Sequence, residues 1–253
     1  MLELPRDHSR IVIIGATSAI AEHCARLWAA APGAMLTLVG RDPGRIERVA
    51  ADLRVRSPGA TVRVMSGNLL DARAIRVLVD AIVRDGMPDR VLIAHGALPD
   101  QQACQRDLGA AFDALQVNAL SPVLFAEAFA GHMEARGGVI TLIGSVAGDR
   151  GRRSNYVYGA AKGLVTRYAQ GLQHRLAGSG SPLRVVLVKP GPTATPMTAH
   201  LPQRGLAPVD AVARRIVDGA AAGTPVVYAP GKWAVVMLVI RHLPAFMFNR
   251  MSI

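Results

Sequence analysis

Short apolar runs alternate with helical patterns along the whole chain, and this alternation limits the possible folds more than any other feature of the sequence. Runs rich in Val, Ile and Leu are typical of strands that are buried on both faces of a parallel sheet. The expected strands are residues 11–14, 35–39, 62–65, 91–94, 139–143, 185–188 and 226–228. Because helical patterns separate these strands, the sequence predicts right-handed crossovers and a doubly wound parallel α/β sheet of the Rossmann type.

The chain has 253 residues, which suits a single α/β domain with a sizeable core. We expect residues 1–228 to form this domain. Residues 229–253 are a short apolar and basic C-terminal extension, which either belongs to the same domain or faces a membrane or a partner. Residues 1–10 are polar and contain no signal-peptide apolar stretch. Cys24 and Cys104 have no metal-ligand spacing, so we expect reduced thiols, a cytoplasmic location and no metal site.

A glycine turn follows the first expected strand. Gly15 allows a sharp turn from strand to helix, and the residues from there to Ala30 have a helical pattern. The first turn of such a helix carries N–H groups without helical partners, and these bind a pyrophosphate. The sequence therefore predicts a dinucleotide site with contacts from Gly15, Thr17, Ser18, Ala19 and Ile20.

A serine, a tyrosine and a lysine form the expected catalytic set. Ser145 follows the strand expected at 139–143, and strand ends of this kind carry the chemistry in doubly wound folds. Tyr158 and Lys162 stand one helical turn apart, so their side chains share a face. A free phenol has a pKa of about 10, and a neighbouring ammonium lowers that pKa by stabilising the phenolate. The pattern predicts that Tyr158 exchanges a proton with a substrate oxygen beside a nicotinamide.

These residues give the chain a resemblance to the short-chain dehydrogenase/reductase family over nearly its whole length. The resemblance implies that Asn118 holds a water behind Lys162 and that Lys162 holds the cofactor ribose. It implies further cofactor contacts from Tyr158, Lys162, Asn68, Leu69, His95, Gly96, Pro190, Gly191, Thr193 and Thr195. The chain departs from the family pattern at Ala19, His95 and Asn68, where a glycine, an alanine and an acidic residue are usual. These departures bear on cofactor affinity rather than on the class of reaction.

The residues after the second expected strand bear on the choice of nicotinamide. An acidic side chain at this strand end would pair with the ribose 2′-hydroxyl of NAD. The chain has Gly40 there and Arg41 next, with Arg45 one helical turn further on. A guanidinium at this place suits the 2′-phosphate of NADP. We therefore expect NADP(H), with NAD(H) as the alternative if Arg41 instead pairs with Asp42 or points into water.

The chain is strongly basic, with a formal net charge of +11. Its arginines are dispersed and no recognition motif accompanies them, so we do not expect a nucleic-acid partner. An anionic membrane surface or a phosphorylated substrate fits the charge better. Arg150, Arg152 and Arg153 stand close before Tyr158 and are the candidates for binding a substrate phosphate, the alternative being a solvated loop.

The C-terminal extension contains the continuous apolar run 233–240, with basic and aromatic residues on its flanks. The run is too short to cross a bilayer, which needs about 20 apolar residues. It suits an element that lies at a membrane interface, or a helix packed on the core or on a partner subunit.

Segments 148–159, 196–201 and 229–244 resemble one branch of the family, the reductases of decaprenylphosphoryl 2-keto-pentose. This resemblance implies a lipid-linked sugar phosphate as substrate, reduced to the arabino alcohol at the inner face of the cell membrane. It also implies a flavoprotein oxidase partner, and the family resemblance implies a homo-oligomer. Two alternatives remain open: a reductase of a small or carrier-linked ketone, or of another glycolipid intermediate, and a non-catalytic nucleotide-binding partner of the oxidase.

Overall fold

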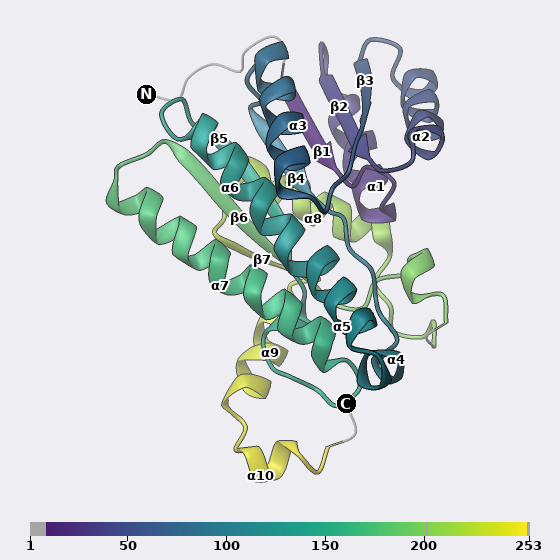
Figure 1. The fold of residues 1–253 in the computed structure, drawn as a ribbon, viewed down its shortest axis with the longest axis vertical. Coiled ribbons are helices and arrows are strands. Elements are labelled where there is room, and N and C mark those ends of the chain that lie inside the picture. The colour runs from purple at the N-terminus through teal and green to yellow at the C-terminus, as the bar shows by residue number, and fades with distance from the viewer. Residues whose placement is uncertain (1–8, 201, 252–253) are drawn as a thin grey trace.

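A computed structural model describes residues 9–200 and 202–251 of the chain. The polar segment expected at residues 1–10 therefore lies largely outside the described residues, as does Leu201 of the segment 196–201. The described residues form one sheet of seven parallel strands in the order β3-β2-β1-β4-β5-β6-β7 (Figure 1). The strands are β1 (Arg10–Ile14), β2 (Met35–Gly40), β3 (Thr61–Ser66), β4 (Arg90–Ile93), β5 (Gly138–Ile143), β6 (Leu183–Pro190) and β7 (Val226–Ala229).

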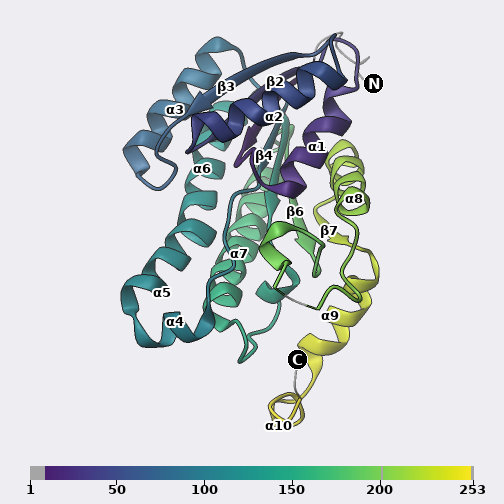
Figure 2. The ribbon, with the colours of Figure 1, turned by 90° about the vertical axis from the view of Figure 1, so that its right-hand side faces the viewer.

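Helices cover both faces of this sheet. Figure 2 shows α3 and α6 on one side of the strands and α1 and α8 on the other. The α-helices are α1 (Ala19–Ala29), α2 (Pro43–Arg56), α3 (Ala72–Asp85), α4 (Gln101–Arg106), α5 (Leu108–Leu115), α6 (Ser121–Met133), α7 (Tyr156–Gly178), α8 (Val209–Ala222), α9 (Lys232–His242) and α10 (Ala245–Phe248). Three further turns are the π-helical η1 (Gln116–Leu120) and the 3-10 helices η2 (Val146–Gly148) and η3 (Pro196–Thr198). Two apolar cores result, one under α1, α2 and α8 and the other under α3, α6 and α7.

The doubly wound single-domain fold predicted from the sequence is confirmed. Each of the seven expected strands is present, with ends that differ by a few residues. The largest difference is in β6, which continues to Pro190 because its last residues pair with β7 up to Ala229. The strand order reverses at β1, whose neighbours are β2 and β4. A ligand site is expected in such a fold at the carboxyl ends of these central strands.

The helices α5, η1 and α6 form one continuous helix, residues 108–133. Of the described residues, this helix alone is long and apolar enough to cross a membrane, judged by length and composition. Its α6 part packs on α3 and against the sheet, and Phe125 and Phe129 are fully buried there. Because its inner face belongs to the core, the helix serves as a covering layer of the sheet.

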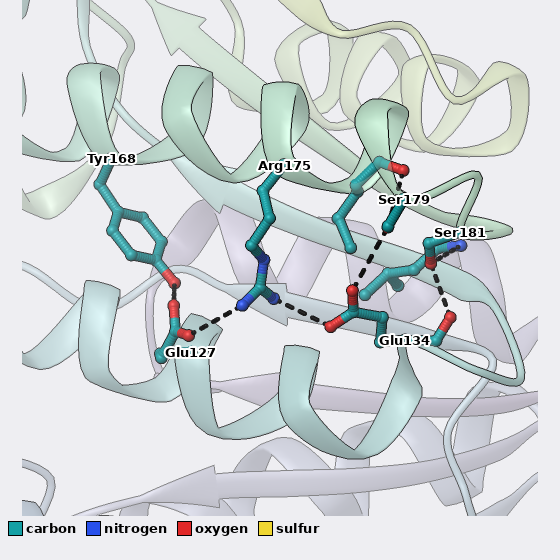
Figure 3. Close-up of polar contacts among 8 residues, drawn as sticks. Glu127, Glu134, Tyr168, Arg175, Ser179 and Ser181 are labelled. Carbon is teal, nitrogen blue, oxygen red and sulfur yellow. Dashed lines mark hydrogen bonds and ion pairs between the residues drawn. The ribbon is translucent and has the colours of Figure 1, made fainter.

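A chain of polar contacts joins the outer surfaces of α6 and α7 (Figure 3). The Tyr168 hydroxyl donates to Glu127 at 2.5 Å, and the Arg175 guanidinium lies 3.5 Å from Glu127 and 3.1 Å from Glu134. Ser181 donates to the Glu134 carbonyl at 2.6 Å, which extends the chain into the turn that follows α7. Each contact at such exposure is worth about 0.2–1 kcal/mol. Together they join α7, which carries Tyr158 and Lys162, to α6, which continues the helix that contains Asn118.

Candidate active site

Two adjoining cavities open at the carboxyl ends of the central strands. The first has a volume of about 160 Å³ and is lined by all four expected catalytic residues, Asn118, Ser145, Tyr158 and Lys162. The second, of about 290 Å³, runs from the glycine turn to Arg41 and Arg45. Both are lined by Ser18, Ile20, His95, Gly96, Thr195 and Met197. The cavities therefore form one cleft, with the chemistry at one end and a basic pair at the other.

Gly15 makes the turn between β1 and α1. Its φ of +82° lies in the left-handed region, and a side chain there would place Cβ 2.6 Å from the Cβ of His95. The glycine thus lets the end of β4 approach the turn. Ser18 is the N-cap of α1 and its side chain makes no capping hydrogen bond, so the first-turn N–H groups face the second cavity without a side-chain cap. This cradle fits a pyrophosphate.

Thr17, Ser18, Ala19 and Ile20 also line the second cavity, as the glycine turn predicts. Ala19 is the first residue of α1 and lies on the cavity wall. The turn therefore forms although Ala19 replaces the glycine that is usual in the family.

The two arginines after β2 are placed at the far end of the second cavity. The Asp42 carboxylate caps α2 by accepting from the backbone N–H of Arg45 at 3.0 Å. Arg41 makes no ion pair with any residue that the structure describes, and Asp42 is used for the cap instead. An unpaired guanidinium on the wall of a nucleotide-sized cleft is suited to bind a phosphate.

His95 follows the end of β4 and lines both cavities. Its Nε2 lies 2.7 Å from the Ser121 hydroxyl, and its ring meets Phe125 edge-on at 5.8 Å between centroids. Burial lowers the pKa of His95 to about 3, with smaller contributions from the charges of Lys162 and Arg41. The imidazole is therefore neutral, and its buried Nδ1 has no partner among the described residues. Ser121 had no signal in the sequence, since only the fold brings it to His95.

The other residues expected around the adenine end differ in their positions. Leu69 lines the second cavity, whereas the Asn68 amide oxygen accepts from the backbone N–H of Leu70 at 2.9 Å. Asn68 therefore shapes the loop after β3. Its side chain oxygen is engaged within that loop.

The catalytic residues converge from three elements. Ser145 follows β5 and caps η2 by accepting from the Ala147 N–H at 3.1 Å, while Tyr158 and Lys162 lie on the first turns of α7. A side chain at Gly148 would place Cβ 2.6 Å from the backbone of Lys162, so this glycine allows η2 and α7 to touch. The close contact brings Ser145 and Tyr158 together on the wall of the first cavity.

Lys162 and Asn118 lie behind this pair and are almost completely buried. The Lys162 ammonium donates to the Ile143 carbonyl at 2.9 Å, and burial lowers the pKa of Lys162 to about 8. Asn118 lies in the π-helical turn η1, where its amide donates to the Ala114 carbonyl and accepts from the Ala97 N–H. π-helical turns of this kind are frequent at functional sites.

Arg152 is the charged side chain that acts on Tyr158. Burial raises the pKa of Tyr158, and the Ser145 hydrogen bond and the Arg152 charge oppose that rise. The Lys162 ammonium lies 5.8 Å from the centre of the tyrosine ring. The sequence predicted that Lys162 lowers the pKa of Tyr158, whereas in the structure that pKa is raised and the opposing charge is that of Arg152. Arg152 lines the first cavity, and burial lowers its own pKa.

The structure separates the three arginines expected to bind a phosphate. Only Arg152 lines the catalytic cavity, and Arg153 is exposed. Arg150 donates to the Ile240 and Leu243 carbonyls at 2.7 and 2.6 Å, at the end of α9. Its guanidinium also lies 4.0 Å above the centre of the Phe248 ring. Arg150 therefore fastens the C-terminal extension.

The loop after β6 closes the first cavity. Pro190, Gly191, Thr193 and Thr195 line it, as the family resemblance implied. The Thr193 hydroxyl donates to the Gly191 carbonyl at 2.9 Å. A side chain at Gly191 would place Cβ 1.9 Å from Trp233 Nε1. The tryptophan of α9 therefore backs the wall of the cleft, a contact that the sequence did not indicate.

Comparisons with known proteins agree with this geometry. Residues 9–205 match the family model of the short chain dehydrogenases. An uncharacterized oxidoreductase from the mprA 5′ region of Streptomyces coelicolor is 30% identical over 99% of this chain and 100% of its own length. A sulfoacetaldehyde reductase of Chromohalobacter salexigens is 29% identical over 74% of each chain. The NADPH complex of a short-chain dehydrogenase from Sphingobium yanoikuyae superposes with a TM-score of 0.78 at 24% identity, covering 96% of each chain.

The chain belongs to the short-chain dehydrogenase/reductase family, and it is an oxidoreductase of that family. Its fold, its glycine turn and its Ser–Tyr–Lys set at the cleft are the features expected from the resemblance of the sequence to this family.

Proposed function

We propose that this protein uses NADPH to reduce a ketone substrate that carries an anionic group. The observation that carries this proposal is the position of Arg152, a partly buried guanidinium on the wall of the catalytic cavity beside Tyr158. A partly buried cation is costly without a counter-charge, and none of the described residues that line this cavity is acidic. An anionic substrate group would supply the missing charge.

The preferred substrate is the 2-keto sugar of a polyprenylphosphoryl pentose, which would be reduced to the arabino alcohol. A phosphodiester next to the sugar suits Arg152, because a guanidinium binds phosphate oxygens in a bidentate manner. The lipid chain would leave the cleft toward α9, whose Trp233 backs the cavity wall at Gly191. The resemblance of segments 148–159 and 229–244 to the decaprenylphosphoryl-2-keto-pentose reductases supports the same substrate.

NADP(H) is the proposed cofactor, and it would supply the hydride to the ketone carbon when bound. The uncapped N–H groups of α1 fit its pyrophosphate, and Arg41 with Arg45 fits a 2′-phosphate. The NADPH that the Sphingobium relative binds supports this assignment. Lys162 would hold the ribose hydroxyls. Its ammonium and the Asn118 amide both lie close to Gly96, where an added Cβ would be 3.6 Å from the ammonium.

Tyr158 donates the proton in this reaction. Tyr158 and Ser145 both line the first cavity, so both can meet the carbonyl oxygen of the substrate. Ser145 orients that oxygen, and the Tyr158 proton neutralises the alkoxide as charge develops on it. Arg152 stabilises the phenolate that remains, and a water held near Asn118 and Lys162 returns the proton.

We also propose a setting for this reaction. A flavoprotein oxidase would supply the 2-keto substrate at the cytoplasmic face of the cell membrane, and the protein would act as a homo-oligomer. The exposed apolar side chains Phe112 and Leu124 on the outer face of α5 and α6 support self-association.

The test is a coupled conversion. Labelled polyprenylphosphoryl ribose is oxidised by the flavoprotein oxidase, and this protein is added with NADPH or NADH before the sugar is identified. Arabinose formed only with both this protein and a nicotinamide supports the proposal. Accumulation of the 2-keto lipid, with protein that binds cofactor, rejects this substrate. Turnover of sulfoacetaldehyde instead would assign a small anionic carbonyl compound.

Two variants sharpen this test. Arg152→Met is expected to raise KM for the anionic substrate about tenfold or more, because a charged hydrogen bond is worth about 1.5–3 kcal/mol. Arg153→Met is its exposed control from the same loop. Tyr158→Phe is expected to lower kcat about 10²–10⁴-fold while cofactor binding is retained. Equal turnover by Tyr158→Phe and the wild type would refute the role given to Tyr158.

A further inference from the structure

The C-terminal extension presents a large apolar surface to solvent. We call it the tail surface and define it by Val235, Leu238, Val239, Phe246 and Met247, which are 67, 52, 57, 66 and 47% exposed. On α9, Leu238 and Val239 both follow Val235 by about one helical turn. Phe246 and Met247 lie on α10. Exposed apolar patches of this kind mark sites of interaction.

The inner face of the extension is fixed to the body. Met237 is 4% exposed, and Trp233 lies against the loop at Gly191. Arg150 binds the last carbonyls of α9 and covers the Phe248 ring of α10. The tail surface is therefore the opposite side of a firmly seated helix pair. In both views α10 forms an extremity of the molecule beyond α9 (Figures 1 and 2).

The charged side chains of residues 229–253 are all basic. Lys232 stands at the start of α9, Arg241 at its end and Arg250 after α10, and no acidic residue follows Asp218 in the sequence. We propose that the tail surface docks this protein on an anionic lipid bilayer, with Val235, Leu238, Val239 and Phe246 entering the interface. Basic side chains at both ends of the apolar stripe then meet the headgroups.

The same charges disfavour a second copy of this chain as the occupant. A two-fold interface would place each positive tail against an identical positive tail, and residues 229–253 contain no acidic side chain to compensate. A bilayer with acidic headgroups has the complementary charge. The α9 helix, 11 residues long, lies on such a surface rather than crossing it, since a span needs about 20 residues.

Docking in this way would turn the cleft toward the lipid. Arg150 and Arg152 belong to one loop, and they join the tail to the catalytic cavity. This orientation suits a lipid-linked substrate and to that extent rests on the proposed function. The docking itself is independent of any substrate.

The test is sedimentation of the full chain with vesicles, without substrate or cofactor. Wild-type protein is expected to bind phosphatidylcholine vesicles that contain phosphatidylglycerol, and to bind pure phosphatidylcholine much more weakly. Leu238→Ser with Phe246→Ser is expected to weaken binding about tenfold or more. Val55→Ser with Val77→Ser is the matched control, because these side chains are 81 and 68% exposed on other helices.

A second pair of variants tests the charges. Lys232→Gln with Arg250→Gln is expected to weaken binding to the anionic vesicles about fivefold for each charge removed. Arg76→Gln with Arg84→Gln, both exposed on α3, is the control for net charge.

Three outcomes would overturn the proposal. The wild type does not bind anionic vesicles, the tail variants bind as the wild type does, or the control variants lose as much as the tail variants. Light scattering on the same proteins could give a fourth outcome that overturns the proposal. A fall in mass for the tail variants alone would assign the tail surface to a second copy. Vesicle binding without arabinose formation would leave the docking standing and reject the substrate, so the two failures are distinct.

Discussion

Replacing Lys162 with methionine is expected to change the pH dependence of stability in the absence of cofactor and to abolish activity. The side chain is 3% exposed in the described structure. Burial lowers its pKa from the ordinary 10.5 to about 8. A difference of that size corresponds to about 3 kcal/mol, which the native state loses by holding a charged ammonium in the core.

The sign of the effect depends on pH. Below pH 8 the ammonium is charged in both the native and the unfolded state, and the full cost is present. Between about 8 and 10.5 the unfolded state binds more protons, so the free energy of unfolding rises with pH. Above that window Lys162 is neutral in both states. The methionine variant has no such titration, so its advantage over the wild type shrinks as the pH rises.

One other term is the same at every pH. The variant loses the hydrogen bond from Lys162 to the Ile143 carbonyl, which costs about 1–3 kcal/mol. This loss displaces the whole curve of the variant and leaves its slope unchanged. The slope of the difference between the two proteins is therefore the quantity to measure.

The measurement is urea denaturation of wild type and Lys162→Met, without cofactor, at a series of pH values from 7 to 10. Lys232→Met, at an exposed lysine of α9, is the matched control for loss of a lysine. As the pH rises, the free energy of unfolding of the wild type should increase relative to that of Lys162→Met. It should not increase relative to that of Lys232→Met. Parallel curves for the wild type and Lys162→Met across this range would refute the burial argument.

Two further predictions concern the cleft and its loop. Arg41→Ala should raise KM for NADPH about tenfold or more and leave KM for NADH nearly unchanged, with Arg84→Ala as the control; equal shifts for both cofactors would remove the 2′-phosphate role. Asp149 and Lys189 form an ion pair whose side chains are 2 and 3% exposed, so Lys189→Met alone should cost about 3–5 kcal/mol in urea unfolding. Asp149→Asn with Lys189→Met should cost less than the two single changes together, and additive losses would contradict coupling of the pair.

The sequence was sufficient to predict the fold and to select candidate catalytic residues that line one cavity, because both predictions follow local rules. Apolar runs of strand length locate the sheet. Gly15 locates the turn, since its φ of +82° and its contact with His95 exclude other residues. The spacing of Tyr158 and Lys162 places both on one face of α7. Each of these signals lies within a few residues of the feature that it predicts.

Contacts between distant segments could not be predicted from the sequence. Arg150 and Arg152 are near neighbours of one residue type, and nothing in their order shows that the first binds α9 while the second lines the cavity. The contact of Trp233 with Gly191 and that of Ser121 with His95 likewise join segments far apart in the chain. Such pairings depend on the packing of whole elements, which composition and periodicity do not encode.

The loop between η2 and α7 explains how one family framework can acquire a particular substrate. Asp149 pairs with Lys189 of β6 and accepts from the Tyr228 hydroxyl of β7 at 2.8 Å, which fixes the start of the loop. Arg150 then holds the C-terminal extension, and Arg152 reaches the cavity beside Tyr158. Because the buried pair holds the loop to the sheet, the two arginines can differ in role although they are so close in sequence. In the proposed function, substrate choice would therefore depend on this loop and on the extension that it holds, while proton transfer would depend on residues that the framework positions independently.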